Sequence, residues 1–368
     1  MTTRMLNKME TTNTSNSKIS SDKISIAIVG LGYWGPNLVR NFDKVKDVEK
    51  VYICDLKQER LDSIKAIYPN TIATRDYNEI LANKEIKAVV IATQPVSTHY
   101  KLAKLALENS KNVFLEKPMT ESSQQAVELI ELAKKNNLII HVDHTFEYSA
   151  PVKMIKQLID SGEIGEIYSI EMLRLNLGIF QNDFNVIWDL CPHDFSILNY
   201  WLNTDPKDLY ASGRCHINPK IEDDAHLIVN YNDKFNVHIH VSWLNPQKVR
   251  KTTIVGSKKM IVYDDADPIE KMRIYDKGVT TGNVEGINQE YGTTNPNEYT
   301  YNYRHGDILI PKIDFTEPLL DEAIHFVDCI KRGVKTKTPG ESGLRVIRMI
   351  EHAAKSLKEG SRVNFNAN

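Results

Sequence analysis

The stretch IAIVGLGYWGPNLVRNF, residues 26–42, decides the fold of this chain. Four apolar residues lead into Gly30, Gly32 and Gly35, which make a G-x-G-x-x-G pattern, and Pro36 follows. Proline is favoured in the first turn of a helix, where its missing N–H costs nothing. A strand, a glycine turn and a helix in this order form a cradle for a dinucleotide pyrophosphate, because bare backbone lets the phosphates approach and the helix N-terminus faces them.

An acid at the end of the next predicted strand supports this interpretation. Residues 50–55, KVYICD, are typical of a strand and end in Asp55. The spacing from the glycines is that of a carboxylate that binds a ribose 2′-OH. A carboxylate there repels a 2′-phosphate, so NAD is favoured over NADP. Lys57 and Arg60 lie just beyond and leave NADP open.

Strand and helix patterns alternate from residue 23 to residue 145. Unbroken runs of Val, Ile and Ala are typical of strands that are covered on both faces, and their alternation with amphipathic helices implies a parallel sheet with right-handed crossovers. The predicted strands are 23–30, 50–55, 86–93, 111–118 and 138–144, and the predicted helices are 36–45, 58–68, 97–109 and 122–137. We therefore predict a doubly wound, NAD-binding Rossmann domain over residues 23–145.

After residue 145 the strands follow one another with few helices between them. The predicted strands are 166–176, 208–213, 225–231, 235–243, 250–256 and 259–264, and the predicted helices are 149–165, 192–202, 317–332 and 341–360. A polar stretch over 276–306 is expected to form a long excursion and a binding loop. We predict an α+β domain over residues 146–368 with a large, mostly antiparallel open sheet. A dinucleotide domain followed by such a domain indicates a redox enzyme whose substrate lies at the crevice.

The composition excludes several other classes of protein. The net charge of −2 over 368 residues gives no electrostatic case for nucleic acid or for an anionic membrane. No apolar run is long enough to span a bilayer, and residues 1–22 lack the apolar core of a secretion signal and are expected to be a disordered tail. The four cysteines are scattered without a CxxC pair, which favours a reducing cytoplasm.

Lys117 is a first candidate for chemistry. It follows a predicted strand within Glu116-Lys117-Pro118, and so lies at the carboxyl end of the sheet, where ligands bind. A lysine there can hydrogen-bond an alcohol, or the carbonyl that the alcohol becomes, and can take part in proton transfer. The alternative is a surface lysine paired with Glu116.

His193 is a second candidate, within WDLCPHDF. Oxidation of an alcohol by hydride transfer needs a base for the hydroxyl proton, and a neutral histidine fits near pH 7. The position just after Pro192 predicts the first turn of a helix, whose positive end would keep the ring neutral. Asp189 or Asp194 could orient the ring. The alternative is that these residues only cap the helix or form a turn.

Two histidine groups resemble metal ligands. HVDH places His141, Asp143 and His144 together, and HIH places His238 and His240 two residues apart on a strand. A third and a fourth ligand are not evident for either group, so we predict no metal site.

Several short segments resemble the glucose–fructose oxidoreductase/inositol dehydrogenase/MocA family. They are GLGYWG, IATQPVSTH, VFLEKP and the aspartate–histidine pair of WDLCPHDF. The resemblance implies a Rossmann domain and a second domain whose open sheet often forms the subunit interface, and hence a homodimer or homotetramer. It also implies that Lys117 and His193 lie beside the nicotinamide and the reacting carbinol.

The resemblance extends to further site residues. It implicates in cofactor binding, besides the glycines and Asp55, the residues Tyr33, Trp34, Thr93, Gln94, Pro95, His99 and Glu116. Tyr148, Arg174 and Asp194 are further candidates for substrate contact. Many members have proline at the position of Gln94 and aspartate at that of Ser196, so the chain departs from the polyol branch of the family.

The variant DLxxHD, together with GDILIP and EPLLDEAIHFVDCI, looks more like a nucleotide-sugar branch. This resemblance implies NAD-dependent oxidation of the C3 hydroxyl of UDP-N-acetylglucosamine ahead of a pyridoxal-phosphate aminotransferase, a step toward diamino sugars of lipid A type. His193 is favoured as the base, and Lys117 stays open. No extra basic cluster is visible in the sequence that would favour the uronate form of the sugar.

Three alternatives remain. One is the 3-dehydrogenase of UDP-N-acetylglucosaminuronate, and a second is an NAD(P)H-dependent C3-ketoreductase of a deoxysugar pathway. The third is a non-enzyme, an NAD-sensing regulator on the same fold, against which the presence of both Lys117 and His193 argues.

Overall fold

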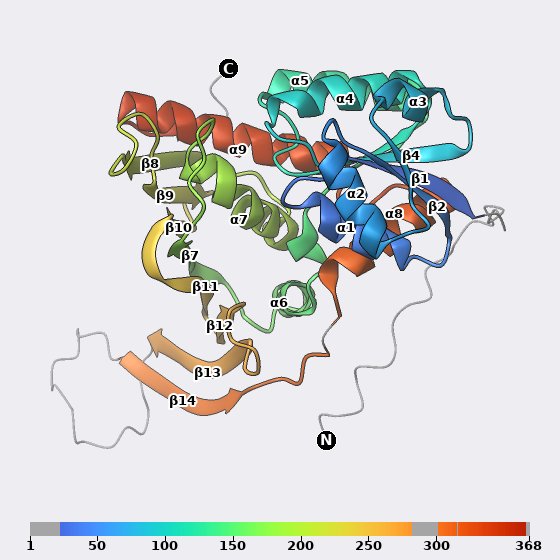
Figure 1. Cartoon of the computed structure of the whole chain (residues 1–368). Coiled ribbons are helices and arrows are strands. Elements are labelled where there is room, and N and C mark those ends of the chain that lie inside the picture. The colour runs from blue at the N-terminus through green and yellow to red at the C-terminus, as the bar shows by residue number, and fades with distance from the viewer. Residues whose placement is uncertain (1–22, 282–300, 315, 366–368) are drawn as a thin grey trace, which may run out of the picture.

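The computed structural model describes residues 23–281, 301–314 and 316–365. They form two sheets, one of six strands and one of nine, with helices between and around them (Figure 1). The tail expected over residues 1–22 lies outside the described residues.

The six-stranded sheet confirms the predicted Rossmann domain. All its strand pairs are parallel, and their order is β3-β2-β1-β4-β5-β6. Its strands are β1 Ile24–Val29, β2 Val48–Cys54, β3 Ile72–Thr74, β4 Ile86–Ile91, β5 Asn112–Leu115 and β6 Ile140–Val142. Its helices are α1 Gly35–Asp43, α2 Gln58–Ile67, α3 Tyr77–Ala82, α4 Ser97–Glu108 and α5 Ser123–Lys135. The strand order reverses between β1 and β4, which places the ligand crevice at the carboxyl ends of these two strands.

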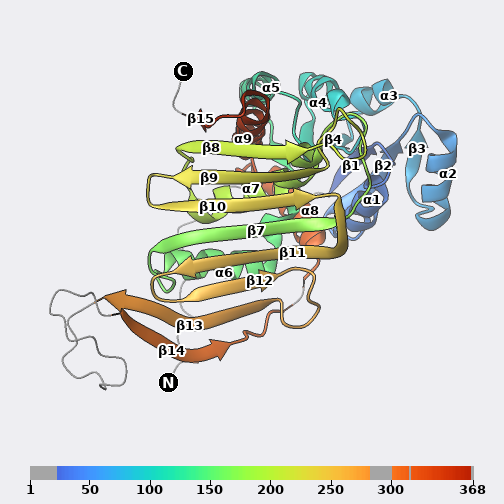
Figure 2. The same cartoon turned by 90° about the vertical axis from the view of Figure 1, so that its left-hand side faces the viewer.

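The nine-stranded sheet has the order β14-β13-β12-β11-β7-β10-β9-β8-β15. Among the described strands of this sheet only β7 and β10 pair in parallel, so the predicted mostly antiparallel sheet is confirmed. Its strands are β7 Ile167–Leu177, β8 Asp208–Arg214, β9 Asp224–Tyr231, β10 Phe235–Ser242, β11 Leu244–Gly256, β12 Met260–Asp264, β13 Met272–Thr281, β14 Tyr301–Leu309 and β15 Val363–Asn364. Figure 2 shows the face of this sheet that the helices leave open.

The excursion predicted over 276–306 is partly wrong. Residues of β13 and β14 on either side of it pair as an antiparallel ladder, from Thr281 opposite Tyr301 to Ile274 opposite Leu309. The polar, Gly- and Tyr-containing sequence hid this hairpin because its residues are mostly exposed and do not alternate with a buried face. Residues 282–300, the remainder of the predicted loop, lie outside the described residues.

The other helices pack against one sheet or lie between the two. They are the short 3₁₀ helix η1 Thr145–Tyr148 and the α-helices α6 Ala150–Asp160, α7 Val186–Leu202, α8 Pro318–Arg332 and α9 Gly340–Glu359. Among the described helices none combines the length and the apolar composition that crossing a membrane requires.

Helix α8 returns to the first domain, although the sequence assigns it to the second. Its buried residues Leu319, Ala323, Phe326 and Val327 share one hydrophobic core with β1, α1 and β2. Phe326 meets Phe42 and Phe114 edge-on, with ring centroids 6.4 and 5.5 Å away. Helix α8 therefore completes the core of the nucleotide-binding part.

Candidate active site

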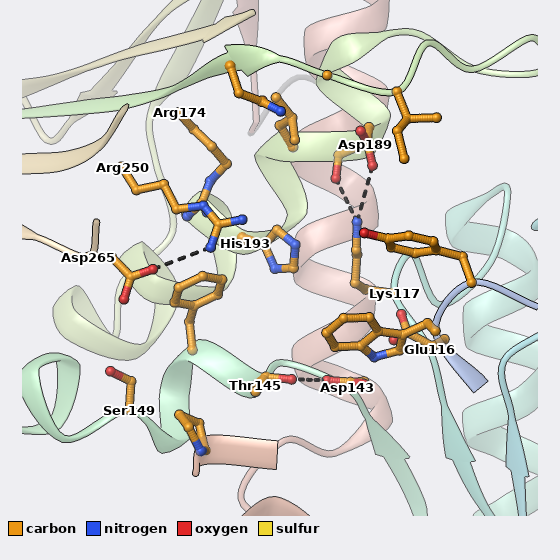
Figure 3. A pocket seen from close by; sticks show the side chains of 18 of the residues that line it. Glu116, Lys117, Asp143, Thr145, Ser149, Arg174, Asp189, His193, Arg250 and Asp265 are labelled. Carbon is orange, nitrogen blue, oxygen red and sulfur yellow. Dashed lines mark hydrogen bonds and ion pairs between the residues drawn. The ribbon is translucent and has the colours of Figure 1, made fainter. Parts of the chain in front are cut away.

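A cleft of about 790 Å³ lies between the two sheets. The first domain lines it with loops that follow β1, β4, β5 and β6, and the second domain lines it with α7, β7 and β11 (Figure 3). This volume is that of a site for a small molecule. The carboxyl ends of the parallel strands thus face the substrate domain, as the sequence predicts.

The glycine turn has the geometry of a phosphate cradle. Gly30 has φ +92°, and a Cβ there would lie 2.7 Å from the carbonyl oxygen of Ala92. A Cβ on Gly35 would overlap the carbonyl oxygen of Gly30. A Cβ on Gly32, in contrast, would meet only Arg60 Nη1 at 3.9 Å, so open space lies beside this backbone. The first and third glycines therefore serve the turn, and the second leaves room for a ligand.

The N-terminus of α1 is available to an anion. The helix starts after Trp34, and no side chain caps it. Its first N–H groups and the open backbone at Gly32 fit the pyrophosphate of NAD. Asp55, predicted to bind a ribose, also holds the turn: its carboxylate accepts from the N–H of Leu31 at 2.7 Å and from that of Lys57 at 2.9 Å.

The loop after β4 divides into lining and supporting residues. Thr93 and Gln94 line the cleft, as do Tyr33 and Trp34, whereas Pro95 and His99 are absent from its lining. His99 is buried, and its ring nitrogens lie 3.0 Å from the carbonyl oxygens of Thr93 and Pro118. The predicted cofactor contact of His99 is therefore wrong: the ring ties together two loops that border the cofactor.

Lys117 points into the cleft and meets α7. Its Nζ donates to the carbonyl oxygen of Asp189 at 2.7 Å and lies 3.4 Å from Asp189 Oδ1 (Figure 3). Asp189 Oδ2 accepts from Trp243 Nε1 at 3.0 Å. The alternative of a surface lysine paired with Glu116 is not what the structure shows, because Lys117 is held from the second domain across the cleft.

The local context predicted for His193 is wrong. Helix α7 begins at Val186, behind an Asn185 cap that accepts from the N–H of Trp188, and Pro192 lies inside the helix. The terminal dipole therefore does not act on His193. Instead the helix places His193 one turn after Asp189, on the same face.

Burial keeps the His193 ring neutral. It lowers the pKa of His193 well below its usual range, and the positive charges of Lys117, Arg174 and Arg250 lower it further. Nδ1 is buried and has no hydrogen-bond partner among the described residues. Neither Asp189 nor Asp194 orients the ring, contrary to the prediction; it packs against Phe146, whose centroid is 5.1 Å away.

Of the further residues predicted to contact substrate, one lines the cleft and two do not. Arg174 lines the cleft, but Asp194 lies behind it and binds it, with Oδ1 2.7 Å from Arg174 Nη2. Tyr148 is buried outside the cleft lining, with its ring 6.1 Å from that of His141 and with Lys337 Nζ 5.0 Å above it. Substrate contact by Tyr148 is therefore wrong.

Two carboxyl groups line the cofactor side of the cleft. Burial raises the pKa of Glu116 well above its usual value, and the neighbouring Asp143 raises it further. Asp143 in turn accepts a hydrogen bond from the Thr145 hydroxyl. This rise favours the protonated form of Glu116, which can donate as well as accept a hydrogen bond.

Sequence reasoning assigned no ligand-binding role to several lining residues, among them Asp143, Phe146, Trp243 and Arg250. Asp143 was considered only as a metal ligand. Arg250 lies opposite Arg174 in the ladder of β11 and β7, and this register is not readable from either strand alone. Trp243 follows the alternating strand β10, and only its contact with Asp189 links it to the site.

The histidines considered as metal ligands have other surroundings. His141 is buried, with Nε2 2.9 Å from Glu322 Oε1, and burial lowers the pKa of His144 to about 3. His240 lies not with His238 but with Asp224 and His226, and the possible ligand atoms of these three lie within 4.8 Å of one another. The sequence could not show this group because His226 is on the neighbouring strand. The prediction of no metal stays a prediction.

Comparison with known proteins agrees with this architecture. Residues 24–144 match a family model described as an oxidoreductase family with an NAD-binding Rossmann fold, and residues 152–262 match the GFO/IDH/MocA C-terminal domain. Myo-inositol 2-dehydrogenase of Thermotoga maritima is 22% identical over 92% of this chain and 98% of the relative, and D-apiose dehydrogenase of Rhizobium rhizogenes is 24% identical over 93% and 97%.

Solved structures share the fold. GenD2 from gentamicin A biosynthesis, in complex with NAD, aligns with a TM-score of 0.78 at 18% identity over 98% of this chain and all of that chain. Levoglucosan dehydrogenase, in complex with NADH and levoglucosan, aligns with a TM-score of 0.77 at 15% identity over 94% of this chain and all of that chain. With both domains matched in order, the chain belongs to the Gfo/Idh/MocA family of oxidoreductases, and its first domain binds NAD.

Proposed function

We propose that the protein uses NAD to oxidise a secondary hydroxyl of a sugar, namely the C3 hydroxyl of UDP-N-acetylglucosamine or of its uronate, ahead of amination by a pyridoxal-phosphate aminotransferase. One observation carries the proposal: a lysine held by Asp189 and a neutral His193 face the same part of the cleft, beside the cofactor loops. Relatives named for inositol, apiose and levoglucosan support the sugar or polyol class.

The two residues have complementary roles. NAD supplies the acceptor for the hydride that leaves the carbinol carbon. His193 takes the hydroxyl proton at a ring nitrogen, and its lowered pKa means that the ring is unprotonated near neutral pH and has a nitrogen open to that proton. Lys117 donates to the same oxygen and stabilises the negative charge that builds on it as the proton leaves. The alcohol thereby loses one proton and one hydride and becomes a ketone.

The surroundings of Lys117 favour this division of roles. Its Nζ donates to the Asp189 carbonyl oxygen and lies 3.4 Å from Asp189 Oδ1, so the amine is already positioned as a donor. Asp189 is held in turn by Trp243. We therefore assign the donor role to Lys117 and the role of base to His193.

The test is turnover by the purified protein with NAD and UDP-N-acetylglucosamine, followed as NADH absorbance, with an aminotransferase or a keto-acid acceptor to pull the equilibrium. The reverse reduction of the 3-keto sugar by NADH uses the same groups and is assayed in parallel. Lys117→Ala should lower kcat about 1,000-fold, with unchanged NAD affinity. Lys101→Ala, on the exposed side of α4, is the control. Near-normal turnover by Lys117→Ala, or NAD binding without turnover in either direction, would contradict the proposal.

We also propose that the protein works as a cytoplasmic homodimer or homotetramer joined through the open face of the nine-stranded sheet. The helices cover only the other face of that sheet (Figure 2). Light scattering of the purified protein gives the subunit count, and a monomer at micromolar concentration would refute the assembly.

A further inference from the structure

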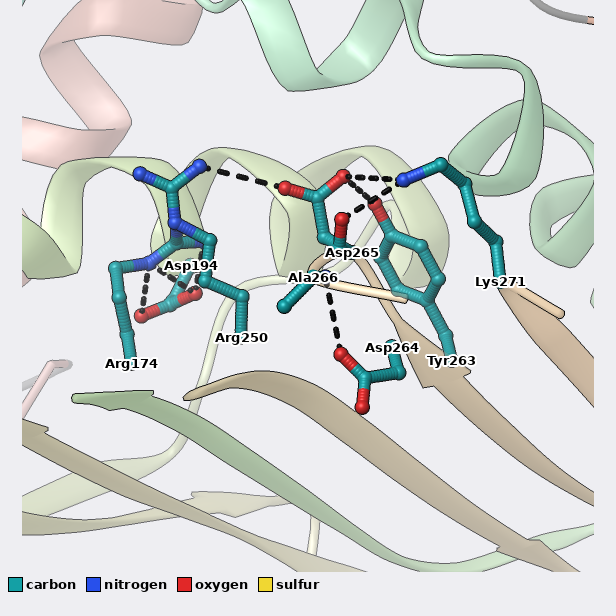
Figure 4. Close-up of polar contacts among 8 residues, drawn as sticks. All are labelled: Arg174, Asp194, Arg250, Tyr263, Asp264, Asp265, Ala266 and Lys271. Atoms are coloured by element: carbon teal, nitrogen blue, oxygen red, sulfur yellow. Dashed lines mark hydrogen bonds and ion pairs between the residues drawn. The ribbon is translucent and has the colours of Figure 1, made fainter. Parts of the chain in front are cut away.

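Three cations gather on the substrate side of the cleft. Arg174 comes from β7, Arg250 from β11, and Lys271 immediately precedes β13, and all three line the cleft (Figure 4). Arg174 and Arg250 stand directly opposite each other in the antiparallel ladder. Like charges at directly opposed positions destabilise a sheet, so this arrangement needs a compensating partner.

The first arginine is only partly compensated. Asp194 binds Arg174 through Nε at 3.1 Å and through Nη2 at 2.7 Å, and the side chain of Arg174 is 8% exposed. The remaining nitrogen, Nη1, is buried and has no hydrogen-bond partner among the described residues. A buried donor left without a partner costs free energy.

The other two cations share one carboxylate. Asp265 lies 3.4 Å from Arg250 Nη1 and 3.8 Å from Lys271 Nζ, and it also accepts from the Tyr263 hydroxyl at 3.1 Å. The Arg250 side chain is 39% exposed. The ion pairs of this cluster therefore join three cations to two carboxylates, and one positive charge is left in excess.

The cluster lies beside the reacting end of the cleft. The guanidinium carbons of Arg174 and Arg250 lie 4.7 and 6.0 Å from the ring centre of Phe146, against which His193 packs. Both arginines are close enough to His193 to lower its pKa, after burial and Lys117. Figure 3 shows His193 between Lys117 on one side and the two arginines on the other.

We propose that Arg174, Arg250 and Lys271 form a subsite for an anionic group of the substrate, a carboxylate or a phosphate carried next to the sugar ring that is oxidised. The proposal rests on the proposed function and narrows its substrate class to acidic sugars. The sequence shows no such basic cluster, because its members are separated by 76 and 21 residues and meet only through the register of the sheet. Planar guanidinium groups suit either oxyanion.

The experiment compares probes that carry a carboxylate, a diphosphate, both groups or neither. The four probes are N-acetylglucosamine, which is neutral, N-acetylglucosaminuronate, UDP-N-acetylglucosamine and UDP-N-acetylglucosaminuronate. kcat/KM, or the inhibition constant where turnover is absent, is measured with the full chain and NAD for wild type and Arg250→Gln. Arg273→Gln is the matched control, since Arg273 lies two residues from Lys271 but outside the cleft lining and pairs with Glu270.

Arg250→Gln should weaken turnover or binding of the anion-bearing probes about 30-fold more than that of the neutral sugar. A loss confined to the two uronates identifies the carboxylate as the ligand, and a loss confined to the two UDP sugars identifies the diphosphate. Equal loss for all four probes, or no loss for any, overturns the subsite.

A binding measurement separates failure of the subsite from failure of the proposed function. Calorimetric titration of the NAD complex with each probe does not depend on turnover. If no probe is oxidised but the acidic probes bind wild type more tightly than Arg250→Gln, the function is wrong and the subsite stands. If oxidation proceeds and binding of all four probes is indifferent to the substitution, the function stands and the subsite is wrong.

Discussion

The two walls of the cleft hold ligands by different means. The cofactor wall consists of bare backbone at Gly32, an uncapped helix end and Glu116, whose pKa burial raises. The substrate wall consists of charges, with Arg174 and Arg250 set against carboxylates from the second domain. The first wall recognises by shape and backbone dipoles, and the second by paired charge, so substitutions on the two walls should fail in different ways.

The largest effect is expected where the substrate wall is buried. Asp194 is 3% exposed and is the carboxylate partner of Arg174. Asp194→Ala leaves a buried guanidinium uncompensated, which should lower the free energy of unfolding by about 3–5 kcal/mol. Urea denaturation measures the loss. The matched control is Asp205→Ala, which breaks the exposed pair with Arg345 and should change stability little; equal losses would contradict the account of a charge-built wall.

Substitution of a turn glycine should impair the cofactor wall by straining its backbone. Gly30→Ala introduces a Cβ at φ +92° and 2.7 Å from the Ala92 carbonyl oxygen, a strain of about 1–3 kcal/mol. If this strain must be overcome when NAD binds, the affinity of the protein for NAD falls about 10- to 100-fold. Fluorescence titration measures the affinity, and thermal unfolding measures the stability.

Gly32→Ala sharpens the comparison, because its Cβ would lie in open space in the protein alone. The thermal midpoint should be unchanged while NAD affinity drops about tenfold, since only a bound pyrophosphate approaches this backbone. Unchanged affinity would mean that the phosphates lie elsewhere.

The charges around His193 set the pH dependence of the reaction. A base works in its unprotonated form, and burial together with Lys117, Arg174, Arg250 and His144 lowers the pKa of His193. An ordinary histidine would lose about 90% of its base form at pH 5.5, whereas here kcat/KM should stay nearly flat to below that pH. Arg250→Gln should move the acid limb to higher pH. An acid limb at the usual histidine value in wild type would contradict the assignment.

The smallest effect is expected at the support of Lys117. Trp243→Phe removes the hydrogen bond to Asp189 Oδ2 but keeps an aromatic ring in the core. A hydrogen bond to a carboxylate contributes about 1.5–3 kcal/mol. The part of it that acts on Lys117, about 1 kcal/mol, should lower kcat about fivefold and leave NAD affinity unchanged. A change in NAD affinity without a change in kcat would place Trp243 outside the substrate wall.

The cofactor wall was predictable because its signal is contiguous. The glycine turn, its flanking strand and helix, and Asp55 all lie within residues 23–55, and local geometry fixes their arrangement. His99 was nevertheless misassigned, since a sequence cannot tell a buried supporting histidine from one that faces a ligand. His193 lines the cleft, but its predicted place at a helix start was wrong, because proline is typical of a first helical turn and Pro192 lies inside α7.

The substrate wall was largely hidden. Arg250 and Arg174 meet through the pairing of β11 with β7, and Asp194 reaches Arg174 from a helix that packs on the sheet. Such contacts depend on register and packing between distant segments, which composition and periodicity do not encode. The pairing of β13 with β14 at the edge of the sheet was not predicted for a related reason. Most of β14 is exposed, so its sequence does not alternate between apolar and polar residues.

The return of α8 to the first domain has a consequence for synthesis of the chain. The nucleotide-binding core lacks Leu319, Ala323 and Phe326 until the ribosome has passed residue 326. The part of this core beside α1 therefore cannot close while most of the second domain is being translated. The cofactor half, although its sheet is made first, depends for its packing on a helix that is made about 180 residues later.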